Sequence, residues 1–180
     1  MDSYKIIFTG PVGAGKTTAI TAISDIEPFA TEEVATDEVR NMKEHTTVAM
    51  DYGVMKLDSG ERIHLYGTPG QERFDFMWEI LTEGGIGLIL LLNNETTDPL
   101  KEMEFYLDVF KEFIDKTNVV IGVTRIKNTT SACRLTDYHR VLTERNLKIP
   151  VFDVDGRNQR DVVILTQALL HSLDPGVKAS

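Results

Sequence analysis

The 180-residue chain contains a single cysteine, Cys133, so it cannot form an intramolecular disulfide. A lone cysteine is typical of a reducing compartment, where disulfides are rare. No apolar run reaches transmembrane length, because the apolar segment 86–92 is only long enough for a strand. The first residues also lack the basic and apolar regions of a signal peptide. We therefore expect a cytoplasmic protein.

Positive charge is also scarce. The chain has 19 Lys and Arg residues against 28 Asp and Glu residues, which gives a formal net charge of −9. Such a surface repels polyanions, so we expect no binding to nucleic acid or to anionic membranes. There is no glycine at position 2 and no cysteine near the last residue, so we expect no lipid anchor.

One short segment has a form that is specific to phosphate binding, G-x-x-x-x-G-K-T. It reads Gly10-Pro11-Val12-Gly13-Ala14-Gly15-Lys16-Thr17-Thr18. A β-rich apolar segment, 4–9, precedes it, and apolar residues at helical spacing follow it. A strand, a glycine-rich turn and a helix are the context that indicates a phosphate-binding loop, or P-loop.

The chemistry of phosphate binding explains these residue types. Glycine lets successive backbone N–H groups curl around a phosphate, and the helix that follows presents its positive end to the same group. Lys16 adds a charge for the outer phosphates, and the Thr17 hydroxyl can bind Mg²⁺. We expect the nucleotide to contact Gly10, Val12, Gly13, Ala14, Gly15, Lys16, Thr17 and Thr18.

The rest of the chain alternates between strand and helix patterns without repeats. The expected strands are 4–9, 48–57, 62–66, 86–92, 119–123 and 151–154, and the expected helices are 16–24, one beginning at 98–99, 134–145 and 162–170. This order predicts an α/β fold: one three-layer P-loop NTPase domain over 1–180, with a mostly parallel six-stranded sheet and one antiparallel edge strand. Ligands of such sheets bind at the carboxyl ends of the strands, here the P-loop, 67–71, 124–127 and 153–157.

The segment Gly67-Thr68-Pro69-Gly70-Gln71 follows a predicted hairpin. Together with the P-loop it resembles the Ras-like small GTPases, most of all a bacterial branch, the gliding-motility polarity (MglA-like) GTPases and relatives encoded with roadblock proteins. The resemblance covers essentially the whole chain, but only the first and third motifs match specifically. It implies that Gly70 donates its N–H to the γ-phosphate, and that Gln71 orients the attacking water as the catalytic residue.

The chain departs from that family at Gly67, where the family has an aspartate that holds Mg²⁺ through a water molecule. Glycine offers no carboxylate, so Mg²⁺ is expected on Thr17, the phosphates, water and a switch residue. By resemblance that residue is Thr47, in a segment similar to the family's T-x-G-x-D-[FY]. Asp37 and Glu44 are alternatives that spacing alone does not separate.

The family's base-binding motif N-K-x-D falls on Thr124-Arg125-Ile126-Lys127, which match it only in position. The family's aspartate accepts two hydrogen bonds from guanine, whereas Lys127 has donors only. The last motif, S-A-K, falls on Asp155-Gly156-Arg157. A Gly156 N–H could still reach the base, and Asp153 or Asp155 could replace the missing carboxylate.

These features predict a switch that binds GTP or GDP with Mg²⁺ and hydrolyses GTP slowly until a partner stimulates it. The resemblance implies a roadblock-type regulatory protein as that partner. Lys127 predicts weak discrimination between guanine and adenine. The substitutions at Gly67 and Lys127 leave open a pseudo-GTPase scaffold without turnover. A phosphotransferase is a third class, but it would need an arginine-rich lid that the sequence does not contain.

Overall fold

The computed structural model describes residues 3–30, 50–70, 75–127 and 133–173. Its strands form one sheet in the order β2-β3-β4-β1-β5-β6-β7. The strand bounds are β1 Ser3–Thr9, β2 Phe29–Ala30, β3 Asp51–Lys56, β4 Arg62–Gly67, β5 Gly87–Asn93, β6 Val119–Thr124 and β7 Val151–Asp153.

The sheet is parallel from β4 to β7 and antiparallel at its other edge, where β3 pairs with both β4 and β2. The mostly parallel α/β architecture expected from the sequence is therefore confirmed, with all six expected strands present. The two-residue β2 is an addition, because a pair of residues is too short to give a strand signal in the sequence.

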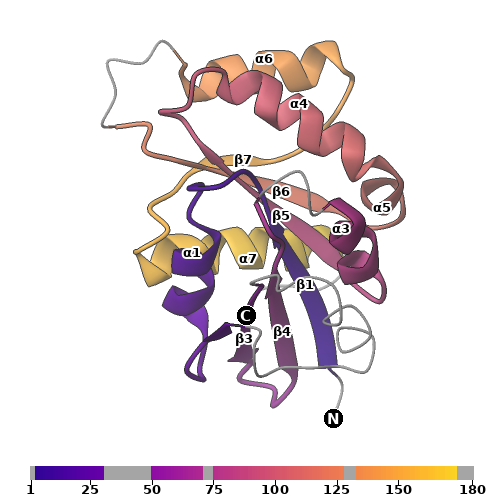
Figure 1. Cartoon of the computed structure of the whole chain (residues 1–180), viewed down its shortest axis with the longest axis vertical. Coiled ribbons are helices and arrows are strands. Elements are labelled where there is room, and N and C mark those ends of the chain that lie inside the picture. The colour runs from indigo at the N-terminus through magenta and orange to yellow at the C-terminus, as the bar shows by residue number, and fades with distance from the viewer. Residues whose placement is uncertain (1–2, 31–49, 71–74, 128–132, 174–180) are drawn as a thin grey trace.

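Helices cover both faces of the sheet (Figure 1). They are α1 Lys16–Ile23, α3 Asp75–Thr82, α4 Pro99–Val109, α5 Lys111–Lys116, α6 Leu135–Glu144 and α7 Gln159–Leu173. The apolar residues of α1 and α7 form one core with β1 and β4, and those of α3, α4 and α6 form a second core on the opposite face. None of the helices in the described ranges has the length and apolar character needed to cross a membrane.

The central strands show why the parallel sheet forms. Every residue of β5 and β6 is buried, as expected for strands covered on both faces. Parallel pairing brings the carboxyl ends of β1, β4, β5, β6 and β7 to one edge of the sheet. The P-loop leaves β1 at this edge, so the segments that follow β4, β6 and β7 are its neighbours.

Helix α7 offers a test of the core because two adjacent residues differ in exposure. Leu165 is fully buried against the sheet, whereas Ile164 is 46% exposed. We expect Leu165→Ala to lower the free energy of unfolding by about 2–5 kcal/mol, because it removes apolar contacts and leaves a cavity. The matched control Ile164→Ala should change it by less than about 0.5 kcal/mol. Urea unfolding measures both, and equal losses would contradict the packing described here.

Candidate phosphate-binding site

The P-loop connects β1 to α1 in a conformation that depends on glycine. Gly10 has a φ angle of +144°, and a Cβ atom built on it would lie 2.0 Å from the carbonyl oxygen of Leu91 in β5. A side chain at this position would therefore clash with backbone that cannot move without breaking the sheet. The loop then turns back on itself, with the Ala14 N–H donating to the Pro11 carbonyl at 3.2 Å, and α1 begins at Lys16.

Lys16 lies with its charge inside this loop. Its ammonium donates to the carbonyl oxygens of Gly10 at 2.6 Å and Pro11 at 2.7 Å. Only 8% of the residue is exposed. Burial lowers the pKa of Lys16 to about 8, although the negative charge of Asp51 opposes part of the shift. The loop thus holds a desolvated cation at its centre, the arrangement that binds phosphate oxygens most strongly.

The next residue, Thr17, contacts a carboxylate that belongs to a different strand. Its Oγ1 donates to Oδ2 of Asp51 at 2.6 Å. Asp51 begins β3 and pairs with Gly67 at the end of β4. Asp51, a residue not among those considered for this place in the sequence analysis, therefore supplies a carboxylate beside Thr17 that Gly67 does not.

The segment that follows β4 is fastened to β1 and reaches the P-loop. The Thr68 N–H donates to the Phe8 carbonyl at 2.8 Å, and the hydroxyls of Thr68 and Thr9 lie 2.8 Å apart. Gly70 then approaches the loop so closely that a Cβ atom on it would lie 2.7 Å from Val12 N and 2.9 Å from Lys16 Nζ. The structure therefore brings Gly70 beside Lys16, and the predicted hydrogen bond from its N–H to a γ-phosphate stays a prediction.

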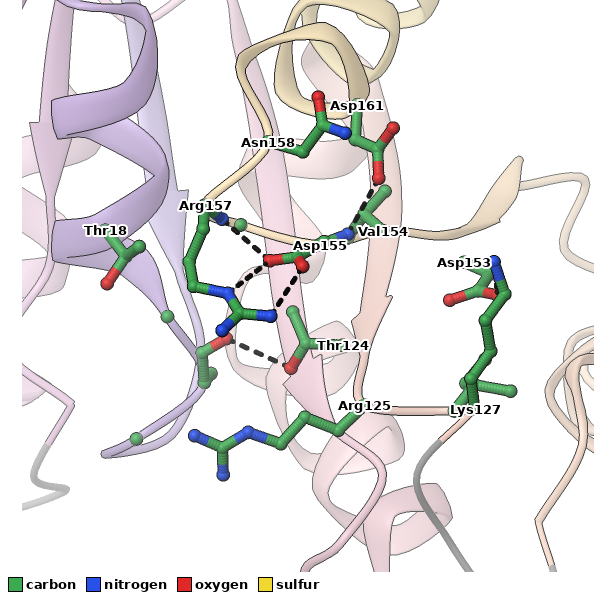
Figure 2. Close-up of a pocket in the computed structure, with 15 residues that line it drawn as sticks. Thr18, Thr124, Arg125, Lys127, Asp153, Val154, Asp155, Arg157, Asn158 and Asp161 are labelled. Carbon is green, nitrogen blue, oxygen red and sulfur yellow. Dashed lines mark hydrogen bonds and ion pairs between the residues drawn. The ribbon is translucent and has the colours of Figure 1, made fainter.

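A cavity of about 580 Å³ opens beside the P-loop, at the ends of β6 and β7 (Figure 2). Its lining includes most of the predicted base-binding and loop positions, namely Gly13, Ala14, Gly15, Thr18, Thr124, Arg125, Lys127, Asp155 and Gly156. Thr124, at the end of β6, links the sheet to the P-loop, because its hydroxyl donates to the carbonyls of Ala14 at 3.4 Å and of Leu92 in β5 at 3.1 Å. The volume lies within the range of small-molecule sites.

Asp155, one of the two proposed replacements for the base-binding carboxylate, is engaged by a neighbour. The Arg157 guanidinium donates to both of its oxygens, at 2.9 and 2.8 Å. These hydrogen bonds lower the pKa of Asp155 to about 2. Figure 2 shows the pair facing each other across the turn after β7. Gly156 is buried between them and packs near the start of α1, with a Cβ position 3.5 Å from the Gly15 carbonyl oxygen.

Asp153, the other proposed replacement, pairs with a lysine. It lies with Lys127 on the side of the cavity away from Asp155 (Figure 2), and Lys127 Nζ is 3.8 Å from its Oδ2. The Lys127 side chain is 87% exposed and that of Asp153 only 28%, so the lysine can move whereas the carboxylate is held. This pair presents a donor and an acceptor side by side.

Some predicted residues lie outside the described ranges, among them Gln71, Thr47, Asp37 and Glu44. Val12 stands at the exposed tip of the P-loop, 64% accessible, and its side chain forms no part of the cavity lining. Sequence reasoning missed two residues of the site, Asp51 and Arg157. Counting outward from the hairpin turn at 58–60 would have placed residue 51 opposite residue 67, but no comparable signal marks Arg157.

The fold, the loop conformation and the buried lysine define a P-loop nucleotide-binding protein. Residues 25–110 match the model of a family described as "Conserved hypothetical ATP binding protein". The chain is also 30% identical, over 124 residues, to an uncharacterized protein of the archaeon Methanocaldococcus jannaschii, a match that covers 66% of this chain and 73% of that protein. The chain belongs to this family of conserved, nucleotide-binding proteins.

These matches correct the assignment to the bacterial MglA-like branch of the Ras-like GTPases, which is wrong. The resemblance rested on the P-loop and on Gly70-Gln71, whereas the two positions that would mark a Ras-like GTPase hold Gly67 and Lys127. The roadblock-type partner followed from that resemblance alone and stays an untested prediction. The family match begins after the P-loop, so the loop geometry and the family support nucleotide binding independently.

The lowered pKa of Lys16 predicts how binding depends on pH. In the free protein the ammonium loses its proton above a pH of about 8. A bound phosphate restores the proton, so nucleotide binding at pH 9 should take up about one proton, and the affinity should fall by up to about tenfold per pH unit above that pKa. Calorimetry of ADP binding in buffers of different ionisation enthalpy measures the uptake.

The exposed Lys148 provides the control for this experiment, because Lys148→Ala should leave the uptake unchanged. ADP is suitable because its phosphates are already ionised in this range. Binding at pH 9 without proton uptake would show that Lys16 is not the group that meets the phosphates.

Proposed function

We propose that this protein is a nucleotide-dependent switch that binds a purine nucleoside triphosphate with Mg²⁺ at the P-loop and hydrolyses it slowly. The observation that carries the proposal is the contact between Gly70 and the loop, where a Cβ atom would lie within 2.9 Å of Lys16 Nζ. A γ-phosphate binds beside this lysine. The third phosphate therefore has to displace or reorder the segment at Gly70, whereas a diphosphate ends short of it.

The same segment is linked to the core through Trp78 of α3. The indole Nε1–H donates to the Pro69 carbonyl at 3.0 Å, and Trp78 is 1% exposed and packs against Tyr106 of α4 and Phe110, the residue after α4. Movement at Gly70 would therefore pull on a hydrogen bond inside the core. This link offers a route by which the state of the third phosphate reaches α3 and the surface around it.

The proposal of hydrolysis rests on the sequence, in which Gln71 directly follows Gly70. A side chain that orients water at the γ-phosphate acts mainly in the transition state, so it affects turnover more than binding. The scaffold without turnover is the competing function, and the phosphotransferase is the third. A nucleotide acceptor that receives the γ-phosphate would identify the latter.

Trp78 is the only tryptophan in the chain, so the tryptophan emission reports on the surroundings of this one ring. We expect a non-hydrolysable triphosphate to change the emission more than the diphosphate of the same base, because only the former displaces Gly70. Excitation at the red edge of the indole band avoids nucleotide absorption. Lys16→Ala, which cannot hold the phosphates, should abolish both responses. Identical responses to the triphosphate and the diphosphate would contradict a switch at this segment.

For Gln71→Leu we expect single-turnover hydrolysis to slow by at least about tenfold while the affinity for the triphosphate changes by less than about threefold. Rapid quench measurements give the rate, and calorimetry gives the affinity. The exposed Gln167, on α7, provides a matched substitution that should alter neither. A variant that turns over as fast as the wild type would remove Gln71 from the mechanism, and a wild type without turnover would select the scaffold.

The base is proposed to be read by Asp153 and Lys127. The Watson–Crick edge of guanine presents two donors, which favour a carboxylate, and the O6 acceptor, whereas that of adenine presents one donor and one acceptor. Because Asp153 offers acceptors and Lys127 offers donors, each base can find partners on this pair. We therefore propose that ATP and GTP both bind, with less than about 100-fold discrimination.

Removing the lysine should shift this balance. We expect Lys127→Ala to raise the preference for GTP over ATP by about tenfold, because the freed carboxylate can accept both guanine donors. Competition titrations with the two nucleotides measure the ratio, and Lys148→Ala, another exposed lysine, is the matched control. A wild-type preference above 1000-fold (on the order of 4 kcal/mol), or no change in the variant, would place base recognition elsewhere.

A further inference from the structure

Asp51 and Gly67 occupy opposite positions of one strand pair. Asp51 is the first residue of β3, Gly67 is the last residue of β4, and the two are direct partners in the antiparallel ladder. Residues directly opposite each other in such a pair project to the same face of the sheet. A side chain on either residue therefore enters the same space, next to the start of α1.

This space holds one side chain. A Cβ atom built on Gly67 would lie 3.1 Å from Asp51 Cβ, 3.2 Å from Asp51 Oδ2 and 3.1 Å from Ile20 Cδ1. In P-loop NTPases a strand-end aspartate holds Mg²⁺ together with the P-loop serine or threonine. Here the last residue of β4, the strand beside β1, is Gly67. Asp51 of β3 fills the volume that a side chain at position 67 would occupy.

The chemistry of Asp51 and Thr17 fits a magnesium ion. Both offer oxygen, the ligand that Mg²⁺ takes, and the Thr17 hydroxyl lies 2.6 Å from Asp51 Oδ2. Within the described ranges, no three His, Cys, Asp or Glu side chains gather into a metal-binding group. The remaining ligands have to come from phosphate oxygens and water, as is usual for Mg²⁺ bound with a nucleotide.

We propose that Asp51 supplies the carboxylate of a magnesium site that Thr17 and the nucleotide phosphates complete, in place of a side chain at position 67. When bound, the ion neutralises phosphate charge and holds the outer phosphates in a fixed orientation. The protein's part is to aim two oxygen atoms at one point from α1 and β3. This inference rests on the proposed nucleotide binding at the P-loop, because the ion enters with the phosphates.

The test compares ADP affinity in Mg²⁺ and in EDTA by calorimetry. The wild type should bind more tightly with Mg²⁺, and Asp51→Asn should lose about 10- to 100-fold of that gain. In EDTA the variant should bind at least as tightly as the wild type, because it lacks a negative charge beside the phosphates. Substitution of a residue that merely supported the loop would weaken ADP binding both in Mg²⁺ and in EDTA. The comparison of the two conditions therefore separates a metal ligand from a structural residue.

The strand pairing also allows a relocation of the carboxylate. In the double variant Asp51→Gly/Gly67→Asp, the Cβ contact with Asp51 is gone and the carboxylate returns from the opposite strand. We expect it to recover at least about tenfold of the Mg²⁺-dependent gain relative to Asp51→Gly alone. Asp58→Asn, at an exposed position of the turn between the same two strands, is the matched control and should behave as the wild type.

Mn²⁺ provides a direct readout of the metal. Electron paramagnetic resonance titrations with ADP present give the apparent affinity for Mn²⁺. This affinity should fall by about 10- to 100-fold in Asp51→Asn but not in Asp58→Asn. If the wild type binds ADP but gains nothing from Mg²⁺, or if Asp51→Asn keeps the full gain, the proposed metal site is wrong and nucleotide binding stands. If no ADP binds under either condition, both the proposed function and the site are wrong.

Discussion

The site depends on one buried positive charge. Lys16 holds its ammonium inside the P-loop, where burial disfavours the charged form and, among the described residues, the carbonyl oxygens of Gly10 and Pro11 compensate for lost water. A charged phosphate oxygen accepts a stronger hydrogen bond from an ammonium than a carbonyl oxygen does. Lys16 would therefore bind a phosphate more strongly than it binds the carbonyls of its own loop. The glycine at position 10 allows this arrangement because the loop crosses against the Leu91 carbonyl with no room for a side chain. Thr17 in α1, Asp51 at the start of β3 and Gly70 after the end of β4 lie near that charge.

The second constraint is the register of the sheet. Because β3 and β4 are antiparallel, the two ends that meet near Thr17 are the beginning of one strand and the end of the other. A carboxylate can therefore approach the same point from either strand, and the fold itself does not require residue 67 to carry it. This explains how a P-loop protein can have glycine at a position where an aspartate is expected and still keep a carboxylate beside its threonine. The same hairpin also positions Gly70, because the chain leaves β4 directly toward Lys16.

Local patterns predicted the fold and the P-loop, because both are written in short stretches of sequence. The continuous apolar runs of β5 and β6 indicated buried parallel strands, and the glycine spacing before Lys16 indicated the loop. Contacts between distant segments were not predictable in the same way. Thr17 and Asp51 are 34 residues apart, and only the strand register brings them together. The ion pair between Arg157 and Asp155 is a local contact, but Asp-x-Arg is too common a pattern to indicate it.

The family assignment failed because the two matching motifs bind phosphate, a task common to many P-loop proteins, whereas the base-binding and metal-binding positions had changed.

The charges around the cavity support the proposal that a cation accompanies the nucleotide. Of the described residues that line the cavity, Arg125, Lys127 and Arg157 are positive, and Asp153, Asp155 and Asp161 are negative. Two of the cations are already paired with two of the carboxylates, and Arg125 lies 3.4 Å from Glu95. The side of the site that receives the base is thus nearly neutral, on a chain whose net charge is −9. Among the described residues, Lys16 and the N–H groups of the loop are the groups that would meet three or four phosphate charges, with Asp51 opposing them. A carboxylate placed beside the phosphates is unfavourable by itself, and it becomes favourable once a divalent ion lies between the two.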